Sequence, residues 1–470
     1  MKKITILLSV FVLSIFLVKA QTVLEVGEGK TFATILDAWN AAKTDPATEI
    51  TINIAEGTYV ETASLSAIAE KKITIIGAGA DKTFVKRSAL DTFTLPGTEG
   101  HVASNPNRLF QFNTSESNLD LTIEKVSIQS MGFNNANGGG FVNVTKDGGN
   151  NLKFTFRNCN FNNVMARAGG IIQTQVADAA LSINFENCFI ENCGSFDNNG
   201  MNALIAFQSG ACSIKNSTFM NNNFSALNIG NKETGTDRNL QSGTLVNGNN
   251  SASRLSIENC YVVNNKFLLG DKDKTHPMFA MKSNIGADSV FITINNLISV
   301  QNRRDNSLDC DLYFQNTFSP IIENAIFNAV RKFERVQVDE LTERLDDTTV
   351  ETIEGTVIID TTKTYISPEV NFEMDATTNL PKILVDETTG VKYLNRLPTG
   401  LADNHANNMR IMNYQGRLTI SVEKPENMTI YNVLGAKVAH FNQVNNAEIS
   451  LTSGAYIIKT TSSTVKVLVK

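Results

Sequence analysis

The sequence predicts an all-β protein built around a right-handed parallel β-helix. A short pattern recurs in the middle of the chain: an apolar alternation, a turn residue, then a second short alternation. Two copies are LKFTFRNCNFNNV (Leu152 to Val164) and LSINFENCFIENC (Leu181 to Cys193). One copy cannot bury its own apolar face, so copies must stack to form a continuous core.

Seven turn residues define the expected rungs. Positions four and two before each turn are mostly apolar, as are positions one and three after it, which indicates two strands with buried faces. Asn suits the turn because it tolerates left-handed backbone better than other residues with a Cβ. The turn residues, 28 to 43 residues apart, are Lys125, Asn158, Asn187, Asn216, Asn259, Asn296 and Asn324.

Two further columns follow from the same alignment. Five residues after the turn, Asn recurs, and stacked Asn side chains can hydrogen-bond from rung to rung. These residues are Asn163, Asn192, Asn221 and Asn264. One residue before the turn, the charge sign alternates along most of the rungs, which avoids like charges in neighbouring strands and predicts a structural role. This second column is Glu124, Arg157, Glu186, Lys215, Glu258, Asn295 and Glu323.

The N-terminus has the features of an export signal. Lys2 and Lys3 precede an apolar run from Ile4 to Val18, and the small residue Ala20 suits cleavage before Gln21. We therefore expect residues 1–20 to be a signal peptide, with a single uncleaved anchor as the alternative. Later apolar runs are too short to span a bilayer, so no transmembrane segment is expected in the mature chain.

Charge and cysteine content narrow the function classes. The chain has 41 basic and 47 acidic residues, and this net charge of −6 argues against a nucleic-acid partner. Cys159, Cys188 and Cys260 share one inward column, which predicts buried thiols that fill core space. A Cys188–Cys193 bridge is the alternative. With 4 His residues and no CxxC pair, a His-based metal site is not expected.

Three N-terminal segments carry a resemblance to a known superfamily. They are TFATILDAWNAAK (Thr31 to Lys43), ITINIAEGTYVE (Ile50 to Glu61) and KKITIIGAGADKTFV (Lys71 to Val85). They resemble the start of pectin lyase-like proteins, especially pectinesterases and pectate lyases. The resemblance implies a β-helix domain over residues 21–400, a monomer, and an extracellular polysaccharide partner. The pectinesterase Gln-Asp pair and Asp-Phe-Ile-Phe-Gly segment are missing, and so is the Arg pattern of the lyases.

The same resemblance implies an N-terminal capping helix. In that superfamily an amphipathic helix covers the open end of the β-helix, and Phe32, Ile35, Leu36 and Trp39 have helical spacing. Gly77 then occupies the turn of an early rung.

The C-terminus resembles a second family, the sorting domain of type IX secretion cargo. The segments that carry it are YNVLGAKVAHF (Tyr431 to Phe441), LTSGAYIIKT (Leu451 to Thr460) and STVKVLVK (Ser463 to Lys470). Short alternating strands with Asn-Asn and Ser-Gly turns predict a small β-sandwich over residues 401–470. The resemblance implies the type IX machinery as partner, export through the periplasm, and a secreted or outer-surface location. A carbohydrate-binding sandwich is the alternative.

A basic stripe is the candidate site. Seven residues after three successive turns come Lys266, Arg303 and Arg331, and acidic residues follow in the enlarged loops. A lyase needs a group that neutralises a uronate carboxylate and a base that removes a proton. The expected catalytic residues are Lys266, Arg303, Asp309 and Asp311, the substrate-binding residues Arg304, Arg331 and Lys332, and the calcium ligands Asp271 and Asp273.

Two function classes follow. One is an enzyme on acidic polysaccharide, either a lyase or a hydrolase with two carboxylates. The other is a non-catalytic adhesin or glycan-binding β-helix. A third interpretation of the same charges is a set of solvated loop residues. Trp39 is the only tryptophan, so no tryptophan platform for sugar rings is expected outside the cap.

Overall fold

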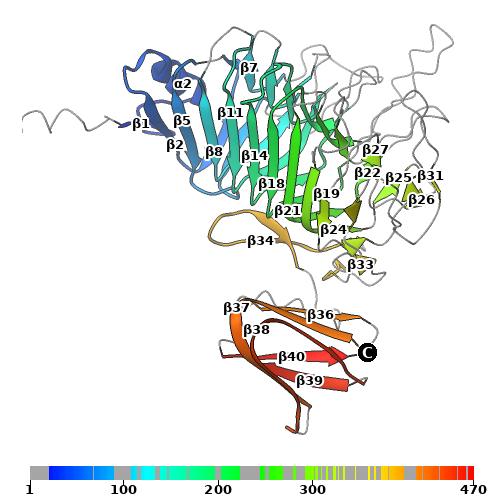
Figure 1. Cartoon of the computed structure of the whole chain (residues 1–470). Helices are drawn as coiled ribbons and strands as arrows, with labels where there is room; N and C mark the ends of the chain where they lie inside the picture. The colour runs from blue at the N-terminus through cyan, green and yellow to red at the C-terminus, as the bar shows by residue number, and fades with distance from the viewer. Residues whose placement is uncertain are drawn as a thin grey trace, which may run out of the picture. The chain divides into compact units, whose positions relative to one another are not determined.

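The structure is a computed structural model of the whole chain, and Figure 1 shows its fold. The residues that it describes are 21–66, 68–88, 107–113, 118–132, 138–145, 148–166, 169–195, 203–222, 244–248, 253–267, 279–281, 292–300, 302–304, 308–309, 314–315, 321–323, 326–327, 332–333, 344–345, 358–359, 365–366, 372–378, 380–395, 409–414, 417–432, 435–452, 454–461 and 464–469.

Parallel strands stack rung upon rung, which confirms the predicted parallel β-helix. A 20-stranded sheet supplies two series of strands, joined where β21 and β24 run through both, and an 8-stranded sheet supplies a third. The first series is β1 (Gln21–Val26), β2 (Glu49–Ile54), β5 (Lys72–Gly77), β8 (Asp120–Glu124), β11 (Lys153–Arg157), β14 (Ser182–Glu186), β18 (Ala211–Lys215), β21 (Arg254–Val263), β24 (Ile292–Val300), β28 (Ile321–Glu323) and β32 (Ile358–Ile359).

Each rung continues with one strand of the second series and one strand of the eight-stranded sheet. The second series is β3 (Gly57–Val60), β6 (Thr83–Lys86), β9 (Ser127–Met131), β12 (Asn160–Ala166), β15 (Phe189–Glu191), β19 (Thr218–Met220), β29 (Ile326–Phe327) and β33 (Tyr365–Ile366), and β16 (Gly194–Ser195) pairs with the end of β12. The eight-stranded sheet is β4 (Leu65–Ser66), β7 (Phe110–Phe112), β10 (Val142–Val144), β13 (Ile172–Thr174), β17 (Ala203–Phe207), β20 (Thr244–Gly248), β23 (Phe279–Met281) and β27 (Phe314–Gln315).

The sharp turns between the first and second series adopt the left-handed conformation that the sequence predicts. The six predicted turn residues from Lys125 to Asn296 have φ between 50° and 56°. Asn187 Nδ2 donates to Asn158 Oδ1 at 2.6 Å, and Asn296 Nδ2 donates to Asn259 Oδ1 at 2.8 Å. The turn residues thus hydrogen-bond from rung to rung, while Asn324 lies outside the described residues. In the predicted column five residues after the turn, Asn264 Nδ2 donates to Asn221 Oδ1 at 2.7 Å, whereas Asn192 Nδ2 donates to Asn162 Oδ1 at 3.2 Å instead of to Asn163.

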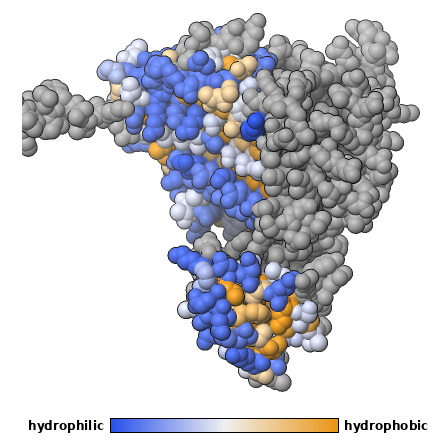
Figure 2. All heavy atoms as spheres, in the orientation of Figure 1, coloured by the Kyte–Doolittle hydropathy of each residue, from blue (hydrophilic) through white to orange (hydrophobic). Residues whose placement is uncertain are grey.

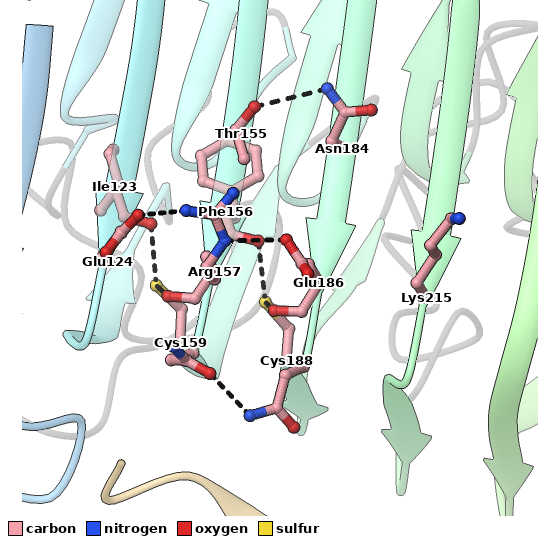
Figure 3. Close-up of polar contacts among 12 residues, drawn as sticks. Ile123, Glu124, Thr155, Phe156, Arg157, Cys159, Asn184, Glu186, Cys188 and Lys215 are labelled. Atoms are coloured by element: carbon pink, nitrogen blue, oxygen red, sulfur yellow. Dashed lines mark hydrogen bonds and ion pairs between the residues drawn. The ribbon is translucent and has the colours of Figure 1, made fainter.

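The alternating charges on the first series are paired as predicted (Figure 3). Arg157 lies between Glu124 and Glu186 in register, and its Nε is 2.7 Å from Glu186 Oε2. These contacts, led by the Glu186 hydrogen bond, raise the pKa of Arg157. Lys215 pairs with Glu258 at 2.9 Å in the same column. This face is largely hydrophilic in Figure 2, and its cations are neutralised by neighbouring rungs.

The core confirms the inward columns. Phe154, Phe156, Phe161 and Phe185 are fully buried or nearly so, and the rings of Phe156 and Phe185 are 4.9 Å apart. The described cysteines, Cys159, Cys188, Cys193, Cys212 and Cys260, are buried and free, so the Cys188–Cys193 bridge does not form. Burial raises the pKa of the Cys193 and Cys260 thiols to about 12.

A buried Asn column inside the coil was not predicted. Asn265 donates from Nδ2 to Asn302 Oδ1 at 3.0 Å, and Asn222 donates from Nδ2 to Asn265 Oδ1 at 2.9 Å. Their amides also donate to the carbonyls of Ile190 and Phe219, each at 3.0 Å. These side chains thus satisfy backbone carbonyls of the preceding rung, and buried polar groups need such partners.

The N-terminal cap is helix α2 (Ile35–Thr44), with Thr34 as its N-cap. The carboxylate of Glu61 accepts hydrogen bonds from the amides of Ile35 and Leu36 at 2.8 and 3.0 Å. Trp39 is fully buried, and its ring centroid lies 5.3 Å from that of Phe110. The prediction was wrong about Phe32, which precedes the helix and pairs with Val26 through an isolated parallel bridge.

A hairpin near the end of the β-helix packs on the second series. It is formed by β34 (Ile383–Val385) and β35 (Lys392–Leu394). Asn160 Nδ2 donates to Gly390 O at 3.0 Å, and the Lys392 amide donates to Asn160 Oδ1 at 3.0 Å. Lys392 also forms an ion pair with buried Glu191. Residues 384–393 therefore belong to the β-helix unit.

The second compact unit comprises residues 369–383 and 394–470. Five antiparallel strands form its sheet, where a β-sandwich was expected: β36 (Met409–Tyr414), β37 (Arg417–Asn432), β38 (Lys437–Ser450), β39 (Gly454–Lys459) and β40 (Thr464–Val469). The long strand β37 pairs with β36 near its start and with β39 near its end. Its pairing with β38 contains register shifts. Its core includes Leu418, Ile420, Ile430 and Ile458. The predicted boundary at 400/401 lies outside the described residues.

Membrane-spanning helices were sought in the described part of the chain. The helices there are all too short or too polar to cross a bilayer.

Candidate glycan-binding site

The outer side of the eight-stranded sheet carries a row of amide side chains. Gln111, Asn143 and Gln173 occupy the same register position on β7, β10 and β13. Their apolar neighbours Phe110 and Phe112 belong to the core, so strand alternation turns the central residue outward. The register continues in both directions with Ser66, Ala206, Asn247, Ala280 and Gln315.

Access to this row decreases along the rungs. Ser66 is exposed and Gln111 half-buried, whereas Asn143 and Gln173 are 5% and 3% exposed. The end of the row at Ser66 and Gln111 is therefore where a ligand meets the amides first. We call Lys43, Ser66, Arg108, Gln111 and Asn143 the amide-row site.

Hydrogen bonds fix the side chains of this site. Gln111 Oε1 accepts from Asn143 Nδ2 at 3.3 Å and from Nη1 of Arg108. Lys43 Nζ donates to Ser66 Oγ, and Trp39 Nε1 donates to Ser66 O at 2.8 Å. Helix α2 thus holds Ser66 at one edge of the site, and β7 carries Gln111 at the other.

Arg108 is the buried cation of this site. Arg108 lies two residues before β7 and is 6% exposed. Burial lowers the pKa of its guanidinium to about 10. Its backbone is fixed by Ser64 Oγ, which donates to Arg108 O at 2.9 Å. Amides and a guanidinium together offer donors and acceptors that match sugar hydroxyls and acidic groups.

The predicted basic stripe is partly covered by the structure. Lys266 on β22 (Lys266–Phe267) and Arg303 on β25 (Arg303–Arg304) are register partners in parallel strands. Arg303 also faces Asp309 on β26 (Leu308–Asp309) in antiparallel register, and Arg304 faces Leu308. The backbone thus brings three of the four predicted catalytic residues to one small sheet.

The remaining predicted site residues do not join that sheet in the described structure. Lys332, on β30 (Lys332–Phe333), faces Leu345 on β31 (Arg344–Leu345). Arg331, Asp271, Asp273 and Asp311 lie outside the described residues. Over the described ranges, His, Cys, Asp and Glu residues form no group of three or more that could hold a metal ion. Calcium at Asp271 and Asp273 stays a prediction.

The amide row was missed in the sequence, although it has a signal there. The strands read FQF, VNV and IQT, an amide between two residues that the coil turns inward. The prediction was based on the Asn turns and on the long loops between rungs, and it therefore placed the site on charged loop residues. A polar residue held at one strand position in successive rungs marks an outward row.

The resemblance of the chain to known proteins is distant. No family model and no curated protein matches the chain. Among solved structures, it is similar to pectin methylesterase PemA from Erwinia chrysanthemi, with 12% identity over 76% of this chain and 91% of that one, at a TM-score of 0.34. Pectate lyase Pel9A shows 10% identity over 83% and 91%, at 0.33.

The structure of a surface adhesin is also similar. PfbA, a surface adhesin of Streptococcus pneumoniae, shows 10% identity over 78% of this chain and 94% of its own, at a TM-score of 0.29. These likenesses are too distant to indicate an activity.

Proposed function

We propose that this protein is an exported β-helix that binds extracellular polysaccharide at the amide-row site. The observation that carries the proposal is the in-register row of Gln111, Asn143 and Gln173 on the core-distal face of one sheet, which is accessible at its Ser66 and Gln111 end. Neighbouring strands are about 4.8 Å apart, so the accessible register partners Ser66 and Gln111 suit a chain of sugar units lying across the strands. Side-chain amides donate and accept, as sugar hydroxyls require.

The substitution Gln111→Ala tests this proposal. We expect it to weaken glycan binding about tenfold or more, because an unsatisfied partner costs about 1–3 kcal/mol and 1.4 kcal/mol is a factor of ten. Affinity electrophoresis of the full chain against a panel of neutral and acidic polysaccharides measures the effect.

Gln129→Ala is the matched control, since Gln129 is a half-buried outward glutamine on the second series that donates to Ser127 Oγ at 2.9 Å. Equal affinities for wild type and Gln111→Ala, or an equal loss in Gln129→Ala, would contradict the proposed site.

A second candidate function is cleavage of acidic polysaccharide by elimination. The pairing of Lys266 with Arg303, and of Arg303 with Asp309, supports it because both cationic residues and a carboxylate share one sheet. Arg303 would neutralise the uronate carboxylate, and Lys266 would remove the adjacent proton; a carbon–carbon double bond would form as the glycosidic bond breaks, and the leaving oxygen would take a proton from water. The product is an unsaturated sugar with ultraviolet absorbance.

Incubation with uronate polysaccharides tests that candidate. Absorbance should rise with wild type and stay flat with Lys266→Ala. A flat trace with wild type across the panel, where glycan binding is intact, would leave the non-catalytic function as the proposal.

Export and sorting complete the proposed function. Residues 1–20 direct export, residues 401–470 address the chain to type IX secretion, and the protein acts as a monomer outside the cell. The charged-then-apolar leader and the C-terminal motifs support this. Deleting residues 431–470 should trap the protein in the periplasm, as measured by immunoblots of cell fractions. Normal surface or medium delivery of the truncated chain would refute the sorting role.

A further inference from the structure

We propose that residues 384–393 form a releasable strap, a preformed hairpin that closes over an aromatic side chain on the outside of the β-helix and opens while the rungs stay folded. These residues belong to the β-helix unit, whereas residues 369–383 and 394–470, on both sides of them, belong to the second unit. The chain therefore enters the β-helix unit at Leu384 and leaves it after Tyr393.

The side chain that the strap covers is Phe189 on β15. Its neighbour Ile190 belongs to the coil core, so strand alternation turns Phe189 and Glu191 outward. Both are nevertheless buried, and an aromatic ring on the outer side of a sheet is shielded from water only where another segment covers it. The strap makes contacts on both sides of the ring, at Asn160, its register partner on β12, and at Glu191. The strap thus crosses the position of Phe189.

Asn160 holds the strap by its backbone. The buried Nδ2 of Asn160 donates to Gly390 O at 3.0 Å and to Ala80 O at 3.3 Å, and its Oδ1 accepts from the Lys392 amide at 3.0 Å. The amide of Ala80 donates in turn to Thr389 O at 3.0 Å. Opening the strap takes two partners from a buried side chain, which favours the closed state.

The tip of the strap is held by its own hydrogen bonds. Asp386 Oδ1 accepts from the amides of Thr388 and Thr389 at 3.0 and 2.8 Å, and from Thr389 Oγ1 at 2.9 Å. Asp386 N donates to Val391 O at 2.9 Å, and Gly390 N donates to Asp386 O at 2.8 Å. These partners all lie inside the strap, so the tip keeps its shape when it leaves the coil.

A second loop of the chain has the same internal bonding. Asp375 Oδ1 accepts from the amides of Thr377 and Thr378 at 2.9 and 2.8 Å, and from Thr378 Oγ1 at 3.1 Å. That loop belongs to the second unit, away from Asn160 in the sequence and in a different setting. The sequence Asp-x-Thr-Thr therefore builds this turn by itself.

The rungs under the strap are complete without it. In the described part of the chain, β34 and β35 pair only with each other. By contrast, β12 pairs with β9 and β15, and β15 pairs with β12 and β19. Opening the strap therefore breaks side-chain contacts and the Ala80 hydrogen bond, but it breaks no ladder of the β-helix.

Gly390→Ala tests how the strap is seated. Gly390 has φ of 72°, and a Cβ there would overlap the side chain and the backbone of Asp81 and lie 2.8 Å from Ala80 N. Gly29→Ala is the matched control, since Gly29 has φ of 69° but nothing within 4 Å of an added Cβ. Both variants carry the strain of a left-handed alanine, so their difference isolates the clash with the coil.

Hydrogen exchange of the full chain, measured by mass spectrometry, follows the opening. In Gly390→Ala we expect peptides with the Lys392 and Ala80 amides to exchange about tenfold faster or more, while peptides from β12 and β15 keep their rates. Gly29→Ala should exchange as wild type does. Unchanged exchange of the strap in Gly390→Ala would overturn the proposal. So would an equal acceleration of β12 and β15, because the strap would then be an inseparable part of the coil.

Lys392→Met opens the strap by another route. It leaves the buried carboxylate of Glu191 without its cation, so the same peptides should exchange faster than in wild type. Lys382→Met is the control, because the ion pair of Lys382 with Glu373, at 2.5 Å, joins solvent-accessible side chains. Equal exchange of the strap in these two variants would contradict its fastening at Glu191.

An apolar dye identifies the side chain that the strap covers. Fluorescence of anilinonaphthalene sulfonate should rise in Gly390→Ala, because the dye binds exposed apolar surface. Adding Phe189→Ala to that variant should return the signal to the wild-type level. No rise in Gly390→Ala, or a rise that persists when Phe189 is replaced, would refute the covering of Phe189.

Discussion

Phe156→Ala should lower the free energy of unfolding by about 3–5 kcal/mol, the usual cost of an unfilled aromatic cavity in a core. Phe156 is fully buried, and its ring lies 4.9 Å from Phe185, 5.7 Å from Phe161 and 5.8 Å from Phe141, measured between centroids. The lost ring would leave a cavity between Phe185 on β14, Phe161 on β12 and Phe141, which directly precedes β10. Denaturant unfolding followed by circular dichroism measures the change.

Phe84→Ala is the control for that experiment. Phe84 is on β6, half-buried, and at the outward position between Thr83 and Val85. Its truncation should cost clearly less, because surrounding water replaces the lost contacts. Equal costs for Phe84 and Phe156 would contradict the inward assignment of the first series.

Asn265→Ala should also destabilise the β-helix strongly, by about 3 kcal/mol or more. Asn265 is 1% exposed, its Nδ2 donates to Asn302 Oδ1 and Phe219 O, and its Oδ1 accepts from the amide and the side chain of Asn222. Alanine would leave several buried groups unsatisfied at about 1–3 kcal/mol each, partly offset by rearrangement. Equilibrium unfolding in urea measures it.

Asn264→Gly provides the neighbouring comparison. Asn264 has φ of 52° and its half-buried side chain donates to Asn221 Oδ1. Glycine adopts that backbone without strain, so the variant should lose much less stability than Asn265→Ala. The reverse order would show that the left-handed turns, rather than the buried column, hold this bend of the coil.

Local sequence patterns predict the rungs because their causes are local. An Asn at a left-handed turn and apolar residues at alternate positions determine the strand faces within one repeat, and stacking then sets the register. Arg157 between Glu124 and Glu186 follows directly, since equal positions in successive rungs become neighbours.

Features that depend on distant segments could not be predicted in the same way. The hairpin at Gly390 contacts Asn160, 230 residues earlier in the chain, and no periodic pattern links the two. Asn222 and Asn265 follow another Asn in the sequence, so a pattern search assigns them to a surface turn rather than to the interior. Phe32 has helical spacing with Ile35, but the chain enters the helix only after the Thr34 cap.

The candidate site also combines features that local sequence predicts with features that depend on distant segments. The amides of Gln111 and Asn143 could be placed on an outward row from FQF and VNV once the eight-stranded sheet was located. The burial of Arg108 with no carboxylate partner among the described residues could not, because it depends on how the cap, β4 and β7 pack. By contrast, Lys266 and Arg303 were predicted from their equal distance after successive turns and Asp309 from the acidic loop that follows, and the backbone pairing brings their strands together.

A crystal structure of the chain with a bound oligosaccharide, chosen from the binding panel, tests the central claim most directly. The predicted result places the sugar chain against β4 and β7, with hydroxyls on Ser66 and Gln111. A sugar chain bound instead to the charged first series around Arg157, or on the C-terminal unit, would contradict the proposed site.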